Sequence, residues 1–211
     1  MATVTIRVNT SIPPDRLMEH VVLVDQHNAV LGTLPKSQVH TLETPLHRGF
    51  SVFIFNQAGE LLLQQRSFNK LTWPGFWSNS CCGHPALGES VAEAIQRRVA
   101  LELGMQVHDL QEALPDFQYR CEYGGVVENE ICPVWLACTH DEPIPNPLEV
   151  AATRWIAWED FKQVLAADVA GHYSPWCKLE TALLDKSWSN SANRSGVPMS
   201  CQSPAKYSPL T

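Results

Sequence analysis

The chain has 211 residues and a formal net charge of −7 at neutral pH. This length suits one well-buried domain, and the acidic balance argues against nucleic acid as the main partner, because phosphate backbones are bound by basic faces. Apolar residues make up 45% of the sequence, but no run of them approaches the ~18 residues of a membrane span, so we expect none.

The N-terminus and the cysteines indicate the compartment. Residues 1–18, which we interpret as an N-terminal extension, contain no apolar core of the kind that a secretory signal needs, so we expect a cytoplasmic protein without disulfides. The seven cysteines are scattered and form no C-x-x-C pair, which argues against a zinc ribbon and a disulfide framework. We interpret most of them as small buried hydrophobes.

The first elements predicted along the chain are a hairpin and a turn that carries two histidines. β-Branched residues on both sides of a polar break predict a hairpin over residues 19–34. His40 and His47 follow, and Thr44-Pro45 interrupts any helix between them. The two imidazoles therefore either converge from a turn or lie separately on the surface.

A loop rich in Gly and Pro comes next, between a second hairpin and a long helix. Residues 50–55 and 61–65 flank the polar segment NQAGE and predict the hairpin. The loop carries Cys82 and His84, and apolar residues then recur at helical spacing over residues 89–104. A thiol, an imidazole and the anion-attracting start of a helix are thus close together.

Two further strands are predicted over residues 117–121 and 126–139. Successive side chains of a strand point to opposite faces, so Glu128 and Glu130 share a face. Two carboxylates on an otherwise apolar strand are costly to bury without cations, so this pair indicates a site. The alternative is a solvated sheet face.

The last predicted elements are a strand over residues 153–158, a helix over 159–168 and another helix that begins with Pro175 in its first turn. Interleaved strands and helices without an internal linker predict a single α/β sandwich over residues 19–186. Residues 187–211 are rich in Ser, Asn and Pro, and we expect a mobile tail there.

Imidazoles and carboxylates together indicate a metal site. A single histidine more often has a structural role, but three of them beside paired carboxylates and a cysteine loop favour ligation. Such a set suits a six-coordinate divalent ion, Mn²⁺ or alternatively Zn²⁺. The residues are His40, His47, His84, Glu128 and Glu130.

Residues 83–105 resemble the Nudix box, G-x5-E-x7-R-E-U-x-E-E-x-G-U, over its whole length. Two positions depart from it, because Arg98 and Leu101 stand where the box has glutamate. Nudix hydrolases use these helix carboxylates to hold divalent ions around the diphosphate that they cleave. Retention of Glu102 alone from that run implies a chain that does not hydrolyse by the usual route.

Several longer segments are similar to one branch of the Nudix fold, the type I isopentenyl-diphosphate isomerases. They are residues 34–51, residues 63–85 with TWPGFWSNSCCGHP, the ENE triplet at 128–130, and HYSPW at 172–176. The resemblance implies a mixed β-sheet sandwich flanked by helices, of class α/β (α+β), and interconversion of isopentenyl and dimethylallyl diphosphate. The alternatives are a Nudix pyrophosphohydrolase acting on a nucleoside diphosphate derivative and a metal-binding ligand sensor.

The same resemblance assigns roles to individual residues. Cys82 and Glu130 match the acid–base groups, with Tyr119 beside Glu130, and we expect the surroundings of His84 to favour a Cys82 thiolate. It assigns the metal ligands His40, His47, His84, Glu128 and Glu130, with Glu102 for a Mg²⁺ ion on the substrate diphosphate. The diphosphate-binding cations are Lys36, Arg66, Lys70 and Arg98. Trp176 would shelter a carbocation by cation–π contact, while Trp73 is either a second shelter or core packing.

The implied cofactors are Mg²⁺ with the substrate and one further divalent ion, Mn²⁺ or Zn²⁺. The implied partner is a small isoprenoid diphosphate. No coiled-coil heptad or apolar patch indicates a protein partner, so we expect a monomer.

Overall fold

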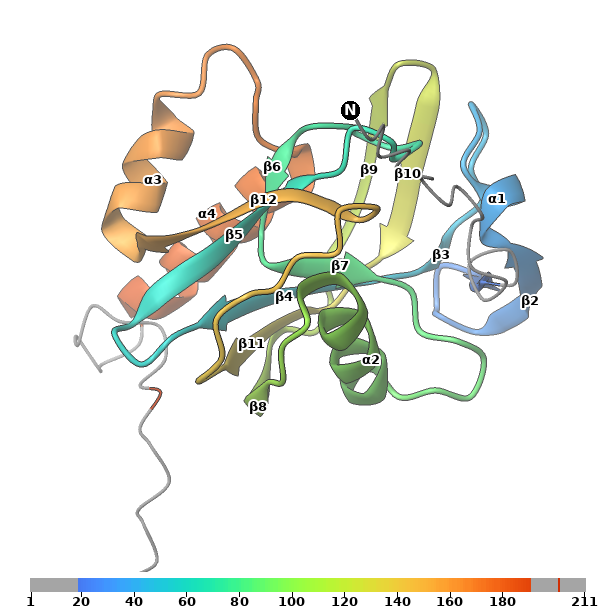
Figure 1. Cartoon of the computed structure of the whole chain (residues 1–211). Helices are drawn as coiled ribbons and strands as arrows, with labels where there is room; N and C mark the ends of the chain where they lie inside the picture. Colours follow the sequence, from blue (N-terminus) through green and yellow to red (C-terminus); the bar gives the residue numbers. More distant parts are fainter. Residues whose placement is uncertain (1–18, 191–200, 202–211) are drawn as a thin grey trace, which may run out of the picture.

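The structure is a computed structural model that describes residues 19–190 and residue 201. The predicted N-terminal extension over residues 1–18 lies outside the described residues. Two mixed β-sheets and four helices make up the described part of the chain (Figure 1). This arrangement confirms the predicted mixed sandwich flanked by helices.

The first sheet has five strands in the order β2-β1-β3-β10-β9. Its strands are β1 (His20–Val24), β2 (Val30–Pro35), β3 (His47–Arg48), β9 (Gln118–Tyr123) and β10 (Val126–Ile131). The first two form the predicted antiparallel hairpin. The short β3 runs parallel to β10 and places His47 beside Glu130. A pairing between distant segments thus brings two predicted site residues together.

The second sheet has seven strands, with β12-β5-β4-β11-β8 as its main path and β6 and β7 attached to β5 and β4. Its strands are β4 (Phe50–Phe55), β5 (Glu60–Arg66), β6 (Trp77–Ser78), β7 (Cys81–Gly83), β8 (His108–Leu114), β11 (Val134–Cys138) and β12 (Val150–Ala157). The helices are α1 (Lys36–Val39), α2 (Val91–Leu103), α3 (Trp158–Ala166) and α4 (Pro175–Asn190).

Strands β4 and β5 pair only at their hairpin end, through Phe55 and Leu61, and then diverge. The Gly/Pro-rich loop fills the opening, because β7 pairs with β4 and β6 pairs with β5. In this pairing Cys82 lies opposite Ser51. A loop held between two core strands can keep a reactive side chain in a fixed place.

The core lies on both faces of the second sheet. All six residues of β4 are buried, and alternate ones enter two separate clusters. Phe53 packs in the cluster with α3 and α4, whereas Val52 packs in the cluster with α2, and Figure 1 shows these helices on opposite sides of the sheet. Because β4 is covered on both faces, its sequence is an almost continuous apolar run.

Helix α2 starts at Val91, two residues after the predicted start, because Ser90 is its N-cap. Ser90 accepts from the backbone N–H of Glu93, and the Glu93 side chain accepts from the backbone of Ser90, which is a capping box. Gly104 ends the helix with φ of 63°, a left-handed conformation that favours glycine. Glu89 binds Arg97 and the backbone N–H of Ala86 instead, and so closes the preceding loop.

Several sequence predictions are corrected by the structure. The single strand over residues 126–139 is wrong: Pro133 lacks a backbone donor, and β10 and β11 on either side of it belong to different sheets. Strand β8 was not predicted, since its polar sequence shows little apolar alternation.

The expectation that disulfides are absent is also wrong. Cys138 and Cys201 are joined by a disulfide, and Cys201 is buried. Residues 187–190 belong to α4 rather than to a tail, and the remainder of the predicted tail, Cys201 apart, lies outside the described residues. No described helix combines the length and apolar character needed to cross a bilayer.

Candidate active site

A cavity of about 420 Å³ is lined by residues of both sheets and by α1, α2 and α4. Most of the predicted site residues line it: Lys36, His40, Arg66, Lys70, Cys82, His84, Arg98, Tyr119, Glu128, Glu130 and Trp176. His47 and Glu102 are fully buried and lie behind these lining residues. Predicted residues from many parts of the chain therefore meet at one cavity.

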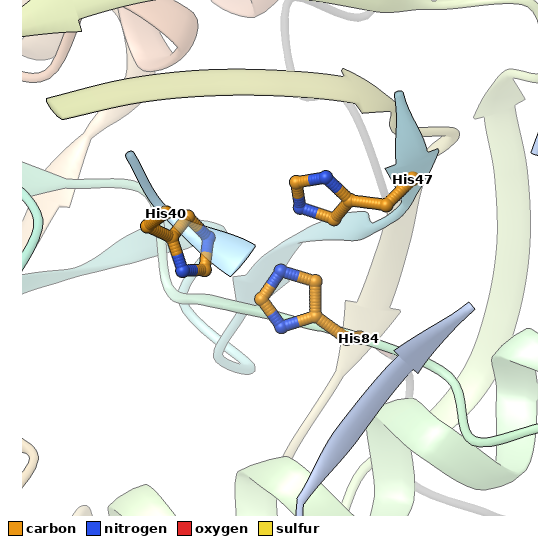
Figure 2. A group of neighbouring side chains, drawn as sticks. All are labelled: His40, His47 and His84. Atoms are coloured by element: carbon orange, nitrogen blue, oxygen red, sulfur yellow. The ribbon is translucent and has the colours of Figure 1, made fainter. Parts of the chain in front are cut away.

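Three histidines from separate elements meet at the wall of the cavity. His40 follows α1, His47 lies in β3, and His84 follows β7. Their ring centroids are 5.2 to 5.8 Å apart, and Figure 2 shows the rings facing a common space. The turn at Thr44-Pro45 thus makes His40 and His47 converge, and the surface alternative is wrong.

The paired carboxylates of β10 lie among these imidazoles. Glu128 Oε2 is 3.0 Å from His40 Nε2, and Glu130 Oε1 is 2.9 Å from His84 Nε2 and 3.3 Å from His47 Nε2. Both glutamates are buried, so the solvated-face alternative is wrong. Burial raises the pKa of Glu130, but its bonds and charge interactions with His47 and His84 lower it well below its usual range.

This cluster fits a divalent ion. The three imidazoles form one group whose nitrogens lie within 4.8 Å of one another, and His47 with Glu128 and Glu130 forms a second. His40 Nε2, His47 Nε2 and Glu128 Oε2 are buried, and among the described residues their close contacts at 3.0 and 3.3 Å do not have the geometry of hydrogen bonds. Buried lone pairs that converge without donors are costly alone and are satisfied by a cation.

Glu102 lies apart from that cluster, on α2. It is in contact with the guanidinium of Arg98, and its Oε1 is 3.9 Å from Lys70 Nζ. Burial raises its pKa, but the charges of Lys70 and Arg98 lower it overall. Leu101, the other departure from the Nudix box, is 40% exposed and faces away from the cavity. Only the Arg98 departure therefore bears on the site.

Cys82 reaches the cavity from β7, whereas its neighbour Cys81 packs in the α2 cluster. The Cys82 thiol donates to Asn79 Oδ1 at 3.2 Å, and its sulfur is 3.4 Å from Ser51 Oγ. Burial, followed by the charge of Glu180, raises the pKa of Cys82 to about 12. The expected thiolate is therefore wrong for this structure, in which the residue is a neutral hydrogen donor.

Aromatic rings close the cavity beside Glu130. The Tyr119 hydroxyl donates to Glu130 Oε2 at 3.1 Å, and the Tyr119 and Trp176 ring centroids are 5.6 Å apart. The Arg66 guanidinium carbon lies 5.4 Å from the centroid of the Trp176 ring. Trp73 packs edge-on against Trp176 without lining the cavity, which favours core packing for Trp73 and leaves the ring of Trp176, itself buried, as the indole in the cavity wall.

The four predicted cations line the same cavity. Arg66 donates to the carbonyl and hydroxyl of Thr72, and Lys36 Nζ lies 2.8 Å from Glu19. Burial lowers the pKa of Arg98, but Glu102 and Glu19 raise it overall. Lys70 Nζ lies 2.6 Å from Glu149 Oε2. These pairs hold the cationic heads at the cavity wall, where a diphosphate would meet several of them.

Some polar residues of this site were not predicted. Glu19 and Glu149 line the cavity and pair with its cations. The residues around each of them in the sequence give no sign of a site. Ser51, Asn79 and Glu180 lie behind Cys82. The only local signal for Glu180 is a carboxylate among apolar neighbours in a helix.

The comparisons with known proteins agree with this geometry. Residues 45–177 match the model of the NUDIX domain. DR0079 from Deinococcus radiodurans has the same fold, with a TM-score of 0.62 over 78% of this chain and 98% of that one, at 18% identity. The MutT protein of Methanosarcina mazei gives 0.54 over 70% of this chain and 98% of that one, at 23% identity. Fold and site thus define a Nudix protein.

Curated relatives show to which branch of the Nudix proteins the chain belongs. The isopentenyl-diphosphate Delta-isomerase of Saccharopolyspora erythraea is 50% identical over 176 residues, which cover 83% of this chain and 90% of the relative. That of Frankia alni is 49% identical over 160 residues, or 75% and 81% of the two chains. The chain belongs to the isopentenyl-diphosphate Delta-isomerase family, and the resemblance seen in its sequence is confirmed.

Proposed function

We propose that this chain interconverts isopentenyl and dimethylallyl diphosphate by adding one proton and removing another. The observation that carries the proposal is that two proton-exchanging groups, Cys82 and Glu130, line the same cavity as four cations. A 1,3-shift of a double bond without redox change requires two such groups across the substrate. The cations supply the site for the diphosphate.

The diphosphate end of the substrate is held by Lys36, Arg66, Lys70 and Arg98. Because these side chains are already fixed by Glu19, Thr72, Glu149 and Glu102, little of their freedom is lost on binding. The hydrocarbon end would then lie against the part of the cavity wall that Cys82, Glu130 and Trp176 form. A Mg²⁺ ion beside Glu102 would neutralise further diphosphate charge.

The proton chemistry is assigned to groups at the hydrocarbon end. Glu130, assisted by the hydroxyl of Tyr119, exchanges a proton with one substrate carbon, and Cys82 exchanges a proton with another. A proton added to the terminal alkene carbon forms a C–H bond and leaves a tertiary cation. Loss of a proton from the adjacent methylene returns its C–H electron pair to the new double bond. The π-face of Trp176 stabilises the cation and helps to exclude water.

The finer assignments are part of the same proposal. His40, His47, His84, Glu128 and Glu130 would hold one Mn²⁺ or Zn²⁺ ion, whose charge would adjust the acidity of Glu130. Glu102 would serve the Mg²⁺ ion that accompanies the substrate. The protein would act as a monomer in the cytoplasm on a small isoprenoid diphosphate.

One incubation tests the reaction. Metal-loaded protein is mixed with isopentenyl diphosphate and Mg²⁺ in D₂O, and the products are followed by NMR. Deuterated dimethylallyl diphosphate supports the proposal, whereas release of phosphate supports the alternative, a Nudix pyrophosphohydrolase, and no reaction supports a ligand sensor. Cys82→Ala and Glu130→Gln should each abolish turnover with an unchanged circular dichroism spectrum; near-normal activity in either would overturn the residue assignment.

A further inference from the structure

Glu180 is a buried carboxyl group that the proposed reaction does not use. It lies on α4, four residues after Trp176, and its side chain is fully buried. Neither of its carboxyl oxygens has a hydrogen-bond partner among the described residues, although the Ser51 hydroxyl lies near enough to act on its pKa. A buried carboxyl in this condition is uncommon and calls for an explanation.

The surroundings of Glu180 favour its neutral form. Burial is the main effect and raises the pKa of Glu180 to about 8; the nearby Ser51 hydroxyl lowers it and the charge of Glu130 raises it. None of these effects comes from a cation. The thiols that face it are Cys82 from β7, Cys132 from the segment between β10 and β11, and Cys177 from its own helix.

Ser51 connects Glu180 to the reacting thiol. Its hydroxyl oxygen is 3.4 Å from Cys82 Sγ and 3.6 Å from Cys132 Sγ. The Cys82 thiol donates its hydrogen to Asn79 Oδ1. The lone pairs of its sulfur therefore remain free to accept a hydrogen bond. Ser51 has a single hydroxyl hydrogen, so it can donate to only one partner at a time. Cys82 accepts a hydrogen bond from Ser51 only when no other acceptor takes that hydrogen.

The protonation state of Glu180 decides between these partners. A neutral carboxyl donates its O–H to Ser51 Oγ and leaves the Ser51 hydrogen free to point at the Cys82 sulfur. An ionised carboxylate can only accept, and it takes the Ser51 hydrogen for itself. In that state Cys82 loses its donor just when negative charge would develop on the sulfur.

We propose that Glu180 is a positioning residue for Cys82: as a neutral acid it donates to Ser51 and thereby directs the Ser51 hydroxyl onto the Cys82 sulfur. The polar chain runs from Glu180 through Ser51 and Cys82 to Asn79. This inference rests on the proposed function, in which Cys82 exchanges a proton with the substrate. The inference adds buried core residues behind the cavity wall to the groups that act on the reacting thiol.

The test compares a conservative and an apolar variant at one position. E180Q keeps the shape and a donor to Ser51 at every pH, whereas E180L removes the donor. We expect kcat of E180L and of Ser51→Ala to fall about tenfold with little change in KM, the size of one lost hydrogen bond to a charged group, and E180Q to recover most of the wild-type kcat. Thr181→Val is the matched control, since Thr181 is buried on the same helix and, among residues 19–190 and 201, its hydroxyl bonds only the backbone carbonyl of Cys177.

The pH dependence separates positioning from packing. Below a pKa of about 8 Glu180 is neutral and donates, so wild-type kcat should fall as pH rises through that value. This basic limb should be absent in E180Q and unchanged in Thr181→Val. An E180Q profile identical to the wild type, or an E180Q kcat as low as that of E180L, would overturn the proposal.

A second measurement does not depend on turnover. The infrared difference spectrum between wild type and E180Q should contain the carbonyl band of a protonated carboxyl at neutral pH, and Ser51→Ala should shift it. Absence of the band, or no shift, would overturn the proposal. If the wild type fails to isomerise the substrate while this band is present and shifts, the proposed function is wrong and the contact of Glu180 with Ser51 stands.

Discussion

Replacement of Arg98 by methionine should destabilise the protein because it leaves a buried charge unpaired. Arg98 is 2% exposed, and its guanidinium contacts Glu102 and lies 3.5 Å from Glu19 and 3.6 Å from Glu149. Removal of one partner of a buried ion pair costs about 3–5 kcal/mol. The lower limit, about 3 kcal/mol, applies here because Lys70 remains 3.9 Å from Glu102.

Calorimetry and urea unfolding measure this cost. For a chain of this length 1 kcal/mol shifts Tm by about 2–4 °C, so Arg98→Met should melt about 6–12 °C below the wild type. Arg97→Met is the matched control, since Arg97 pairs with Glu89 near the surface and should lose less than about 1 kcal/mol. The double variant with Glu102→Gln should recover part of the loss. Equal stability of the Arg98 and Arg97 variants, or no recovery, would refute the reasoning.

Other expected outcomes concern the acid–base group and the disulfide. Tyr119→Phe removes the donor to Glu130 and should lower kcat about tenfold to a hundredfold in steady-state kinetics, with the fold retained; an unchanged kcat would exclude an assisting role. Gly49→Ala would place a Cβ onto the Glu130 carboxylate and should abolish most activity in a protein with a normal circular dichroism spectrum; wild-type turnover would contradict this. Cys201→Ser opens a loop of 63 residues to Cys138 and should cost about 4 kcal/mol in urea unfolding. A reductant should reproduce that loss in the wild type and add nothing in the variant.

The parts of the site that follow from local pattern could be predicted from the sequence. The two-residue period of a strand places Glu128 and Glu130 on one face, and the structure has them so. Helical spacing and Gly104 predict the extent of α2 to within two residues. These features depend on neighbours in the chain, so the sequence carries them directly.

Features that depend on distant pairing could not be predicted in this way. The turn after His40 does not by itself decide whether His40 and His47 come together. The parallel pairing of β3 with β10 places His47 beside Glu130. The break at Pro133 is a local signal, because a proline inside a run that resembles a central strand argues against one continuous strand. The disulfide of Cys201 and the position of Glu180 behind Cys82 depend on packing between segments far apart in the sequence.

In the proposed reaction the two sheets divide the chemistry, and this division would account for the departure from the Nudix box at Arg98. The first sheet supplies Glu130 with its histidine neighbour and Tyr119, while the second sheet and α2 supply Cys82 and Arg98. A hydrolase needs its metal beside the diphosphate, so its box concentrates carboxylates on the helix. An isomerase needs its acid–base groups on both sides of the hydrocarbon and only an anchor at the diphosphate. Exchange of one helix carboxylate for the buried cation Arg98, with the carboxylates of the metal cluster on β10 instead of the helix, would meet that need.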